Sequence, residues 1–346
     1  MDVSQLFSKT LSGAKLRSLS IGKIRGLQQI STADGIFTMC AMDHRDSLKS
    51  MLEKAWGREP NYEEMVEFKL DLCTALAPYA SAVLLDPIYG APQCIAQGVL
   101  PRNTGLLVSI EATGYESTSE GRITRLLDGW NVEKIKRMGA SAVKILIYYR
   151  PDLKEVARTQ QDTISKVAKE CLQHDIPFLV EPKTYALQDE NPRSAQFAAK
   201  KPYLVTETVR QVTSLPVDVL KVEFPADFDY EKDDSKLLGL CHQLDEAATV
   251  PWVILSAGID YPAFRKEVEL ACRAGASGFL GGRAIWQEAV TIADRKDRKR
   301  FLSTTVVERL KELSELATKY GRPWYQKLGL ERARLAAVNE NWYRDY

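Results

Sequence analysis

The sequence predicts an α/β fold of the (β/α)8 TIM-barrel type, built as a single domain with helical extensions at both ends. Eight short apolar runs have strand character, and helical segments separate nearly all of them. A doubly wound open sheet is the competing topology, but no glycine fingerprint for a dinucleotide follows the first strand. We therefore expect an N-terminal extension over residues 1–30, a barrel over 31–290 and a helical tail over 291–346 that packs on the barrel.

The expected strands are short and apolar, and several are rich in β-branched residues. They cover residues 36–42, 81–85, 106–110, 141–147, 177–180, 216–225, 251–255 and 277–280. Apolar residues at helical spacing predict the helices, which cover 48–56, 62–76, 132–138, 153–174, 203–213, 237–246 and 263–274. Residues 113–131 contain three glycines and are predicted to form a loop.

The tail beyond the eighth strand contains a basic run over residues 295–300. We interpret this run as the solvated face of a helix in preference to a nucleic-acid patch. Trp324, Tyr325 and Trp342 indicate that the tail docks on the barrel or on a second subunit. The formation of a homo-oligomer is therefore an open alternative.

Composition excludes several classes of protein. The chain has 346 residues and a formal net charge of +1, so bulk electrostatic binding to nucleic acid or membrane is not expected. No apolar stretch approaches the ~18 residues of a membrane span and the N-terminus has no apolar signal core, so we expect a cytoplasmic protein. The six cysteines are scattered without a C-x-x-C pair, and no two of the three histidines have a metal-ligand spacing. Neither a disulfide framework nor a metal site is expected.

Lys221 stands in the middle of the run P-V-D-V-L-K-V-E-F-P over residues 216–225. Alternation along a strand places it on one face with Val217, Val219 and Glu223. Burial disfavours the charged form of a lysine, and a neutral amine is what Schiff-base formation with a carbonyl substrate requires. The alternative is a structural lysine that pairs with Glu223 or with a carboxylate of the next strand.

The carboxyl ends of the predicted strands carry chemically functional residues, and in this type of barrel those ends converge on one rim. The residues at the strand ends are Asp43, Asp86, Glu111, Lys144, Glu181, Lys221, Ser256 with Gly258, and Gly281-Gly282-Arg283. The S-A-G and G-G-R turns offer free backbone N–H groups and a guanidinium, which suits a phosphate; tight turns without a ligand are the alternative.

The charged residues at these ends suggest distinct roles. Lys144 would lie across the barrel mouth from Lys221 and could hold a substrate oxygen. Glu181 is the candidate for proton transfer, because burial raises the pKa of a carboxyl towards the operating range. Asp43 is placed to bind or deprotonate a substrate hydroxyl. Each carboxylate could instead be the ion-pair partner of a lysine.

Several motifs resemble the class I tagatose-1,6-bisphosphate aldolase family, in order from about residue 30 to 290. The motifs are I-S-T-A-D-G-I-F-T-M-C-A-M-D-H-R, L-L-D-P-I-Y-G-A-P, G-L-L-V-S-I-E-A-T-G-Y-E, A-S-A-V-K-I-L-I-Y-Y, I-P-F-L-V-E-P-K-T-Y, V-D-V-L-K-V-E-F-P and W-V-I-L-S-A-G-I-D through G-G-R-A-I-W. The resemblance implies that Lys221 is the Schiff-base lysine, Glu181 the acid/base carboxylate, and Asp43 and Lys144 the assisting pair. It also matches Ser256, Gly258, Gly282 and Arg283 to the phosphate-binding turns. We add Gly281, Arg45 and Glu111 to the predicted substrate- and phosphate-binding residues.

The family's reaction is the reversible cleavage of a ketohexose bisphosphate into dihydroxyacetone phosphate and glyceraldehyde 3-phosphate. The resemblance implies a covalent imine through Lys221, with no metal and no other cofactor, and sugar phosphates as the binding partners. Because imine formation does not depend on the configuration at C4, the expected substrates include fructose 1,6-bisphosphate and other C4 epimers.

Two alternatives stay open. The motifs after the seventh and eighth strands resemble the related sulfofructose-1-phosphate aldolases equally well, which give dihydroxyacetone phosphate and sulfolactaldehyde. The first strand ends in D-H-R-D where the family usually has D-Q-R-G, so contacts to the distal part of the sugar differ. A hypothesis of another class is a non-catalytic regulator that senses sugar phosphates, but it would be expected to lack a lysine or a carboxylate of the set.

Overall fold

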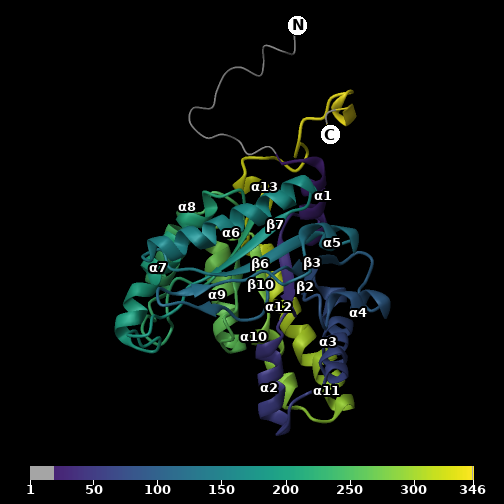
Figure 1. Cartoon of the computed structure of the whole chain (residues 1–346), viewed down its shortest axis with the longest axis vertical. Coiled ribbons are helices and arrows are strands. Elements are labelled where there is room, and N and C mark those ends of the chain that lie inside the picture. Colours follow the sequence, from purple (N-terminus) through teal and green to yellow (C-terminus); the bar gives the residue numbers. More distant parts are fainter. Residues whose placement is uncertain (1–18, 345) are drawn as a thin grey trace.

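The computed structural model, which describes residues 19–344 and 346, contains a closed barrel of eight parallel strands (Figure 1). The barrel strands are β1 (Phe37–Ala41), β2 (Ala82–Leu85), β3 (Gly105–Ser109), β6 (Ala142–Tyr148), β7 (Phe178–Lys183), β8 (Val219–Val222), β9 (Trp252–Leu255) and β10 (Gly278–Gly281). They pair in the order β1-β10-β9-β8-β7-β6-β3-β2, and β2 closes on β1. The predicted barrel is confirmed.

Helices follow most of the strands and cover the outside of the barrel. They are α2 (Asp46–Trp56), α3 (Tyr62–Leu76), α4 (Ala91–Ala96), α5 (Val132–Arg137), α6 (Lys154–Gln173), α7 (Ala195–Thr213), α8 (Asp234–Ala247), α9 (Tyr261–Ala274) and α10 (Arg283–Trp286). The sequence missed the short α4, and it placed the start of α7 at residue 203. In the structure Ser194 caps α7 by accepting a hydrogen bond from the Phe197 N–H, and Pro202 lies inside the helix.

The glycine-containing segment over residues 113–131 is not wholly irregular. It contains a hairpin of two short antiparallel strands, β4 (Glu116–Ser117) and β5 (Arg122–Ile123). The guanidinium of Arg122 lies 4.4 Å from the ring centre of Tyr115 and 4.8 Å from that of Tyr185, which fixes the hairpin against the end of β7. This hairpin forms part of the same rim as the carboxyl ends of the strands.

The N-terminal end of the barrel is closed by segments from both ends of the chain. In α1 (Ile21–Ile30), Leu27 and Ile30 are fully buried, and they pack in one cluster with Trp324 and Tyr325 of α13 (Trp324–Lys327). Figure 1 shows α1 and α13 side by side at this end. Part of the predicted extension, residues 1–18, lies outside the described residues. Trp342 is 37% exposed, so it does not share this docking site.

Helices from the predicted tail also cover the side of the barrel. Helix α12 (Val307–Tyr320) packs on α9 and against β1 and β10, the position of the helix that follows the eighth strand. The basic run forms α11 (Arg295–Phe301), and its Arg295 contacts Asp71 of α3 at 2.9 Å. Arg298 contacts Glu67 of α3 at 3.4 Å. The run is therefore an ion-paired helix contact as well as a solvated face.

No helix among the described residues is long and apolar enough to cross a membrane.

Candidate active site

The alternation of the barrel strands brings the predicted residues together. A layer of apolar side chains fills the barrel: Ala41, Ala142, Leu179, Val219 and Leu280. Two residues further along the same strands or just beyond them lie Asp43, Lys144, Glu181, Lys221 and Gly282, all of which line one cavity. Because side chains two apart share a face, the reactive residues form the next inward layer above an apolar floor.

This cavity has a volume of about 330 Å³ and opens at the carboxyl ends of the strands. Its charged lining consists of Asp43, Asp46, Glu111 and Glu181 with Arg45, Lys144, Lys183, Lys221 and Arg283. Cations and carboxylates are therefore mixed throughout, and the site is polar in its chemistry. Such a lining suits a hydroxylated, anionic small molecule rather than an apolar ligand.

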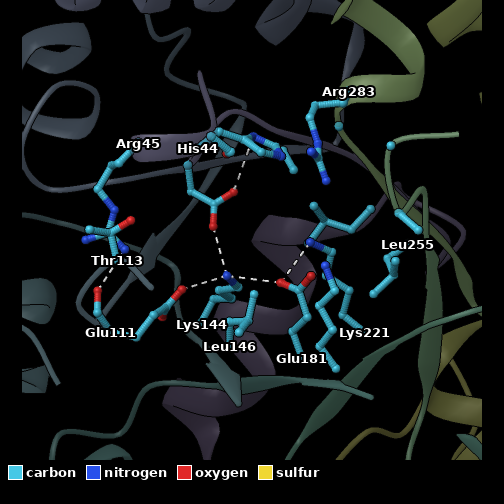
Figure 2. Close-up of a pocket in the computed structure, with 18 of the residues that line it drawn as sticks. His44, Arg45, Glu111, Thr113, Lys144, Leu146, Glu181, Lys221, Leu255 and Arg283 are labelled. Atoms are coloured by element: carbon cyan, nitrogen blue, oxygen red, sulfur yellow. Dashed lines mark hydrogen bonds and ion pairs between the residues drawn. The ribbon is translucent and has the colours of Figure 1, made fainter. Parts of the chain in front are cut away.

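Lys144 is the centre of an ion-pair network (Figure 2). Its Nζ lies 2.8 Å from Asp43 Oδ2, 2.8 Å from Glu111 Oε1 and 3.0 Å from Glu181 Oε2. Burial alone would lower the pKa of Lys144, but the three carboxylates hold it well above its usual range. Lys144 therefore stays an ammonium ion, which makes it a donor to an oxygen atom and unsuited to act as a nucleophile.

Of the two lysines in this network, Lys221 contacts a single carboxylate. Its Nζ lies 2.9 Å from Glu181 Oε2, and only 5% of the residue is exposed. The strand β8 carries it into the cavity above Val219, as the alternation predicted. Among the described residues Lys221 does not pair with Glu223, whose carboxylate accepts hydrogen bonds from the N–H and hydroxyl of Thr184. The other expected pairing, with a carboxylate of a neighbouring strand, does occur, because Glu181 belongs to β7.

Glu181 joins the two lysines through one oxygen atom, Oε2. Burial would raise its pKa, as the sequence analysis expected, but the ammonium groups of Lys144 and Lys221 outweigh burial and lower the pKa. The expected direction was therefore wrong. The charge that decides the direction comes from two other strands, and Glu181 is held as an ionised carboxylate.

Asp43 and His44 follow β1 at the wall of the cavity. Burial opposes ionisation of Asp43, yet Lys144 and Lys221 hold its pKa well below the usual range. Burial lowers the pKa of His44 to about 3, with a further contribution from Arg283, so the imidazole is neutral at physiological pH. Its Nδ1 is buried without a hydrogen-bond partner. Sequence reasoning did not select His44, although its place beside Asp43 was a signal.

The turns after β9 and β10 face each other across a short distance. The N–H of Gly282 donates to Ser256 Oγ at 3.2 Å. Ala257 and Gly258 both have positive φ, 44° and 81°, and the Ile259 N–H closes the turn on the Ser256 carbonyl. Arg283 lies beside Gly258, and its Nε is buried without a partner. We call Ser256, Gly258, Gly282 and Arg283 the anion cradle. The expected free N–H of Gly282 is used by Ser256, so the unpaired donor that suits an anion here is Arg283 Nε.

Gly281 is the one predicted substrate- or phosphate-binding residue that does not line the cavity. A Cβ atom there would meet Ile285 Cδ1 and Phe264 Cε1 at 2.7 Å, so the residue faces the helical layer. The alternation that turns the Gly282 position inward turns the Gly281 position outward. Its assignment to phosphate binding stays a prediction.

Arg45 and Glu111 lie on the side of the cavity opposite this cradle. Arg45 donates from Nη2 to the Glu111 carbonyl oxygen at 2.8 Å, while its Nη1 is buried without a partner. Asp86, another strand-end residue, does not line the cavity. It is fully buried in an ion pair with Lys69, which also donates to the Met42 carbonyl and so supports the residue before Asp43.

We predict that Gly258→Ala weakens anion binding at the cradle. A Cβ there would lie 3.0 Å from the Arg283 guanidinium carbon, and φ is +81°. We expect about tenfold lower affinity for inorganic phosphate, measured by calorimetry, and about 1 kcal/mol lower stability. Gly57→Ala is the matched control, because Gly57 has φ +70° with nothing within 4 Å of the new Cβ. Equal phosphate affinity in all three proteins would contradict the cradle.

No group of three His, Cys, Asp or Glu side chains that could hold a metal ion is found among residues 19–344 and 346. The three carboxylates nearest the centre of the site surround the Lys144 ammonium instead. The positive charge between these carboxylates is therefore the Lys144 ammonium, which occupies the position that a metal ion would need.

Comparisons with known proteins agree with this geometry. Residues 37–288 match the model of the DeoC/LacD family aldolase. The tagatose 1,6-diphosphate aldolase of Listeria monocytogenes serotype 4a (strain HCC23) is 33% identical over 326 residues, which cover 89% of this chain and 95% of that protein. The enzyme of the same name from Lactococcus lactis subsp. lactis is 34% identical over 324 residues, covering 88% and 98%.

Solved structures share the fold at much lower identity. A fructose-bisphosphate aldolase from Plasmodium falciparum superposes with a TM-score of 0.68 at 14% identity, covering 88% of this chain and 98% of that one. An archaeal fructose 1,6-bisphosphate aldolase gives 0.57 at 18% identity, covering 85% and 98%. Both likenesses concern the barrel.

Proposed function

The chain belongs to the DeoC/LacD family of aldolases, and on this premise we propose that it is a Schiff-base (class I) aldolase. Its proposed reaction is the reversible cleavage of D-tagatose 1,6-bisphosphate into dihydroxyacetone phosphate and glyceraldehyde 3-phosphate. The observation that carries the proposal is the position of Lys221, buried in a polar cavity with its Nζ 2.9 Å from the Glu181 carboxylate. The fully paired Lys144 leaves Lys221 as the nucleophile.

The proposed mechanism begins with a proton transfer. Glu181 takes a proton from Lys221, and the neutral amine attacks the C2 ketone to form a carbinolamine. Glu181 returns a proton to the departing hydroxyl group, and loss of water gives a protonated imine. Lys144 remains an ammonium throughout and holds substrate oxygen atoms beside the reacting carbons.

Carbon–carbon cleavage follows from the positive charge on the imine. A carboxylate, Glu181 or Asp43, accepts the proton of the C4 hydroxyl; the C3–C4 bond breaks, and its electron pair moves to the imine nitrogen. The aldehyde product leaves with C4, and the enamine is protonated at C3 before water releases dihydroxyacetone phosphate. The cradle at Ser256, Gly258, Gly282 and Arg283 is proposed to hold the phosphate on C1.

Fructose 1,6-bisphosphate and other C4 epimers fall within the proposal, because attack at C2 does not depend on the configuration at C4. One observation keeps sulfofructose 1-phosphate as a second candidate: His44 occupies the D-H-R-D position at the cavity wall. The regulator hypothesis gains no support, since the matching relatives are named aldolases.

The proposal is tested by offering the purified protein tagatose 1,6-bisphosphate, fructose 1,6-bisphosphate and sulfofructose 1-phosphate in the presence of a chelator. Release of dihydroxyacetone phosphate is followed with a coupled assay. We expect the highest kcat/KM for a hexose bisphosphate. A higher value for sulfofructose 1-phosphate would replace the proposed substrate, and release from none of the three would overturn the reaction.

Glu181→Gln is expected to slow turnover by about 10²- to 10³-fold, because the amide cannot carry a proton between Lys221 and the substrate. Its pH–rate profile should lose the limb that belongs to the carboxylate. The comparisons are the wild type at matched ionic strength and the control variant Glu190→Gln. Glu190 is a carboxylate that binds Arg150 outside the cavity. A turnover rate within twofold of the wild type would remove Glu181 from the mechanism.

A further inference from the structure

A lysine with no role predicted from the sequence lines the same cavity, although it stands within the motif I-P-F-L-V-E-P-K-T-Y. Lys183 is the last residue of β7 and follows Glu181 by two positions, so both side chains point inward. At about 3.3 Å of rise per residue, Lys183 stands roughly 7 Å nearer the mouth than Glu181. Its register partner on β6, Tyr148, also lines the cavity.

Among the lysines that line this cavity, Lys183 differs in having no counter-ion. Lys144 and Lys221 each contact a carboxylate. Within residues 19–344 and 346, no hydrogen bond or ion pair to the Lys183 ammonium is found, although the residue is half-buried. A cation left unpaired in a partly enclosed cavity favours an anionic ligand.

The backbone around Lys183 is held rigidly. Its carbonyl accepts a hydrogen bond from the Tyr149 N–H at 2.9 Å. The next residue, Thr184, donates to Glu223 from both its N–H and its hydroxyl at 2.7 Å. The ammonium is therefore presented from a fixed strand end, and only its side-chain torsions must be ordered when a ligand binds.

The position of Lys183 separates it from the anion cradle. The cradle belongs to the ends of β9 and β10, while Lys221 on β8 lies between the cradle and β7. A substrate bonded through its carbonyl carbon to Lys221 extends one end towards the cradle. Its other end extends past Glu181, towards Lys183 at the end of β7.

We propose that Lys183 is a specificity-determining residue that binds the anionic group, phosphate or sulfonate, at the end of the substrate farthest from the imine. This inference rests on the proposed aldolase reaction and adds the recognition of the second anion. The contribution is electrostatic and acts on substrates that carry the distal charge.

The test compares acceptor aldehydes in the condensation direction, with dihydroxyacetone phosphate saturating. Glyceraldehyde 3-phosphate and sulfolactaldehyde carry the distal anion, and glyceraldehyde does not. Lys183→Met should lower kcat/KM about 10- to 100-fold for the anionic aldehydes, mainly through KM, and less than twofold for glyceraldehyde. The larger of the two anionic losses identifies the natural group. Lys154→Met, which removes an exposed charge from the start of α6, should change none of the values.

Each other outcome overturns the assignment. Equal losses with glyceraldehyde and the anionic aldehydes would place Lys183 in the steps that all acceptors share. No loss with any acceptor would make the ammonium a solvated bystander. A binding measurement separates this inference from the proposed reaction, because it needs no turnover: Lys183→Met should weaken binding of hexitol 1,6-bisphosphate and spare hexitol 1-phosphate. Equal affinities of both ligands for wild type and variant would refute the role of Lys183 even in an inactive protein.

Discussion

Lys221→Ala is expected to reduce aldol cleavage by about 10⁴-fold or more and to abolish the covalent adduct that borohydride traps with dihydroxyacetone phosphate. The side chain is the only lysine of the network with a single carboxylate contact, whereas Lys144 is held as an ammonium by three. Without its amine, no imine forms and the C3–C4 electron pair has no acceptor. Intact mass and peptide mapping of the trapped protein provide the measurement.

The wild type should carry one adduct, on Lys221, with a chelator present. Lys154→Ala is the matched control, since it removes an exposed lysine outside the cavity and should leave both adduct and rate unchanged. An adduct that persists in Lys221→Ala, or that maps to Lys144 in the wild type, would reassign the nucleophile. A wild type without any adduct would end the Schiff-base proposal.

Much of the site could be predicted because one rule links sequence to position in a parallel barrel. Side chains alternate, and the carboxyl ends of the strands meet at one rim. That rule alone brings Asp43, Lys144, Glu181 and Lys221 into one layer. Applied one step further it would also have identified Lys183, two residues beyond Glu181, and it would have placed Gly281 on the outward face of its strand.

Other features depend on contacts that no local pattern contains. The pKa of Glu181 is lowered because Lys144 and Lys221 approach it from neighbouring strands, which a single-strand view cannot show. The basic helix α11 finds its acidic partners on α3, more than 200 positions earlier in the chain. Such pairings depend on how the helices pack around the barrel. The sequence therefore predicted that this helix is basic, but it did not predict that α3 provides the acidic partners.

Lys144→Met is expected to lower the free energy of unfolding by about 3–5 kcal/mol at pH 7, because it leaves Asp43, Glu111 and Glu181 buried together with a single ion pair, Lys221 to Glu181. In the wild type, Lys144 and Lys221 lower the pKa values of Asp43 and Glu181 in the folded state. That contribution is fully present above the unfolded pKa values of about 4 and is lost as the pH falls through the lower folded values.

The variant should reverse this dependence. Without Lys144, burial raises the carboxyl pKa values above those of the unfolded chain, so the folded state binds more protons between about pH 4 and pH 7. Unfolding in urea at pH 7 and pH 5 should therefore show Lys144→Met gaining stability at the lower pH, whereas the contribution of these carboxyls to wild-type stability stays constant. Lys23→Met is the comparison, because it removes the ion-pair partner of a single carboxylate, Asp218, at the other end of the barrel. This variant should lose less unfolding free energy at pH 7 than Lys144→Met, and it should regain less at pH 5. A Lys144→Met protein as stable as the wild type at pH 7, with the same pH slope, would mean that the ammonium does not hold the three carboxylates together.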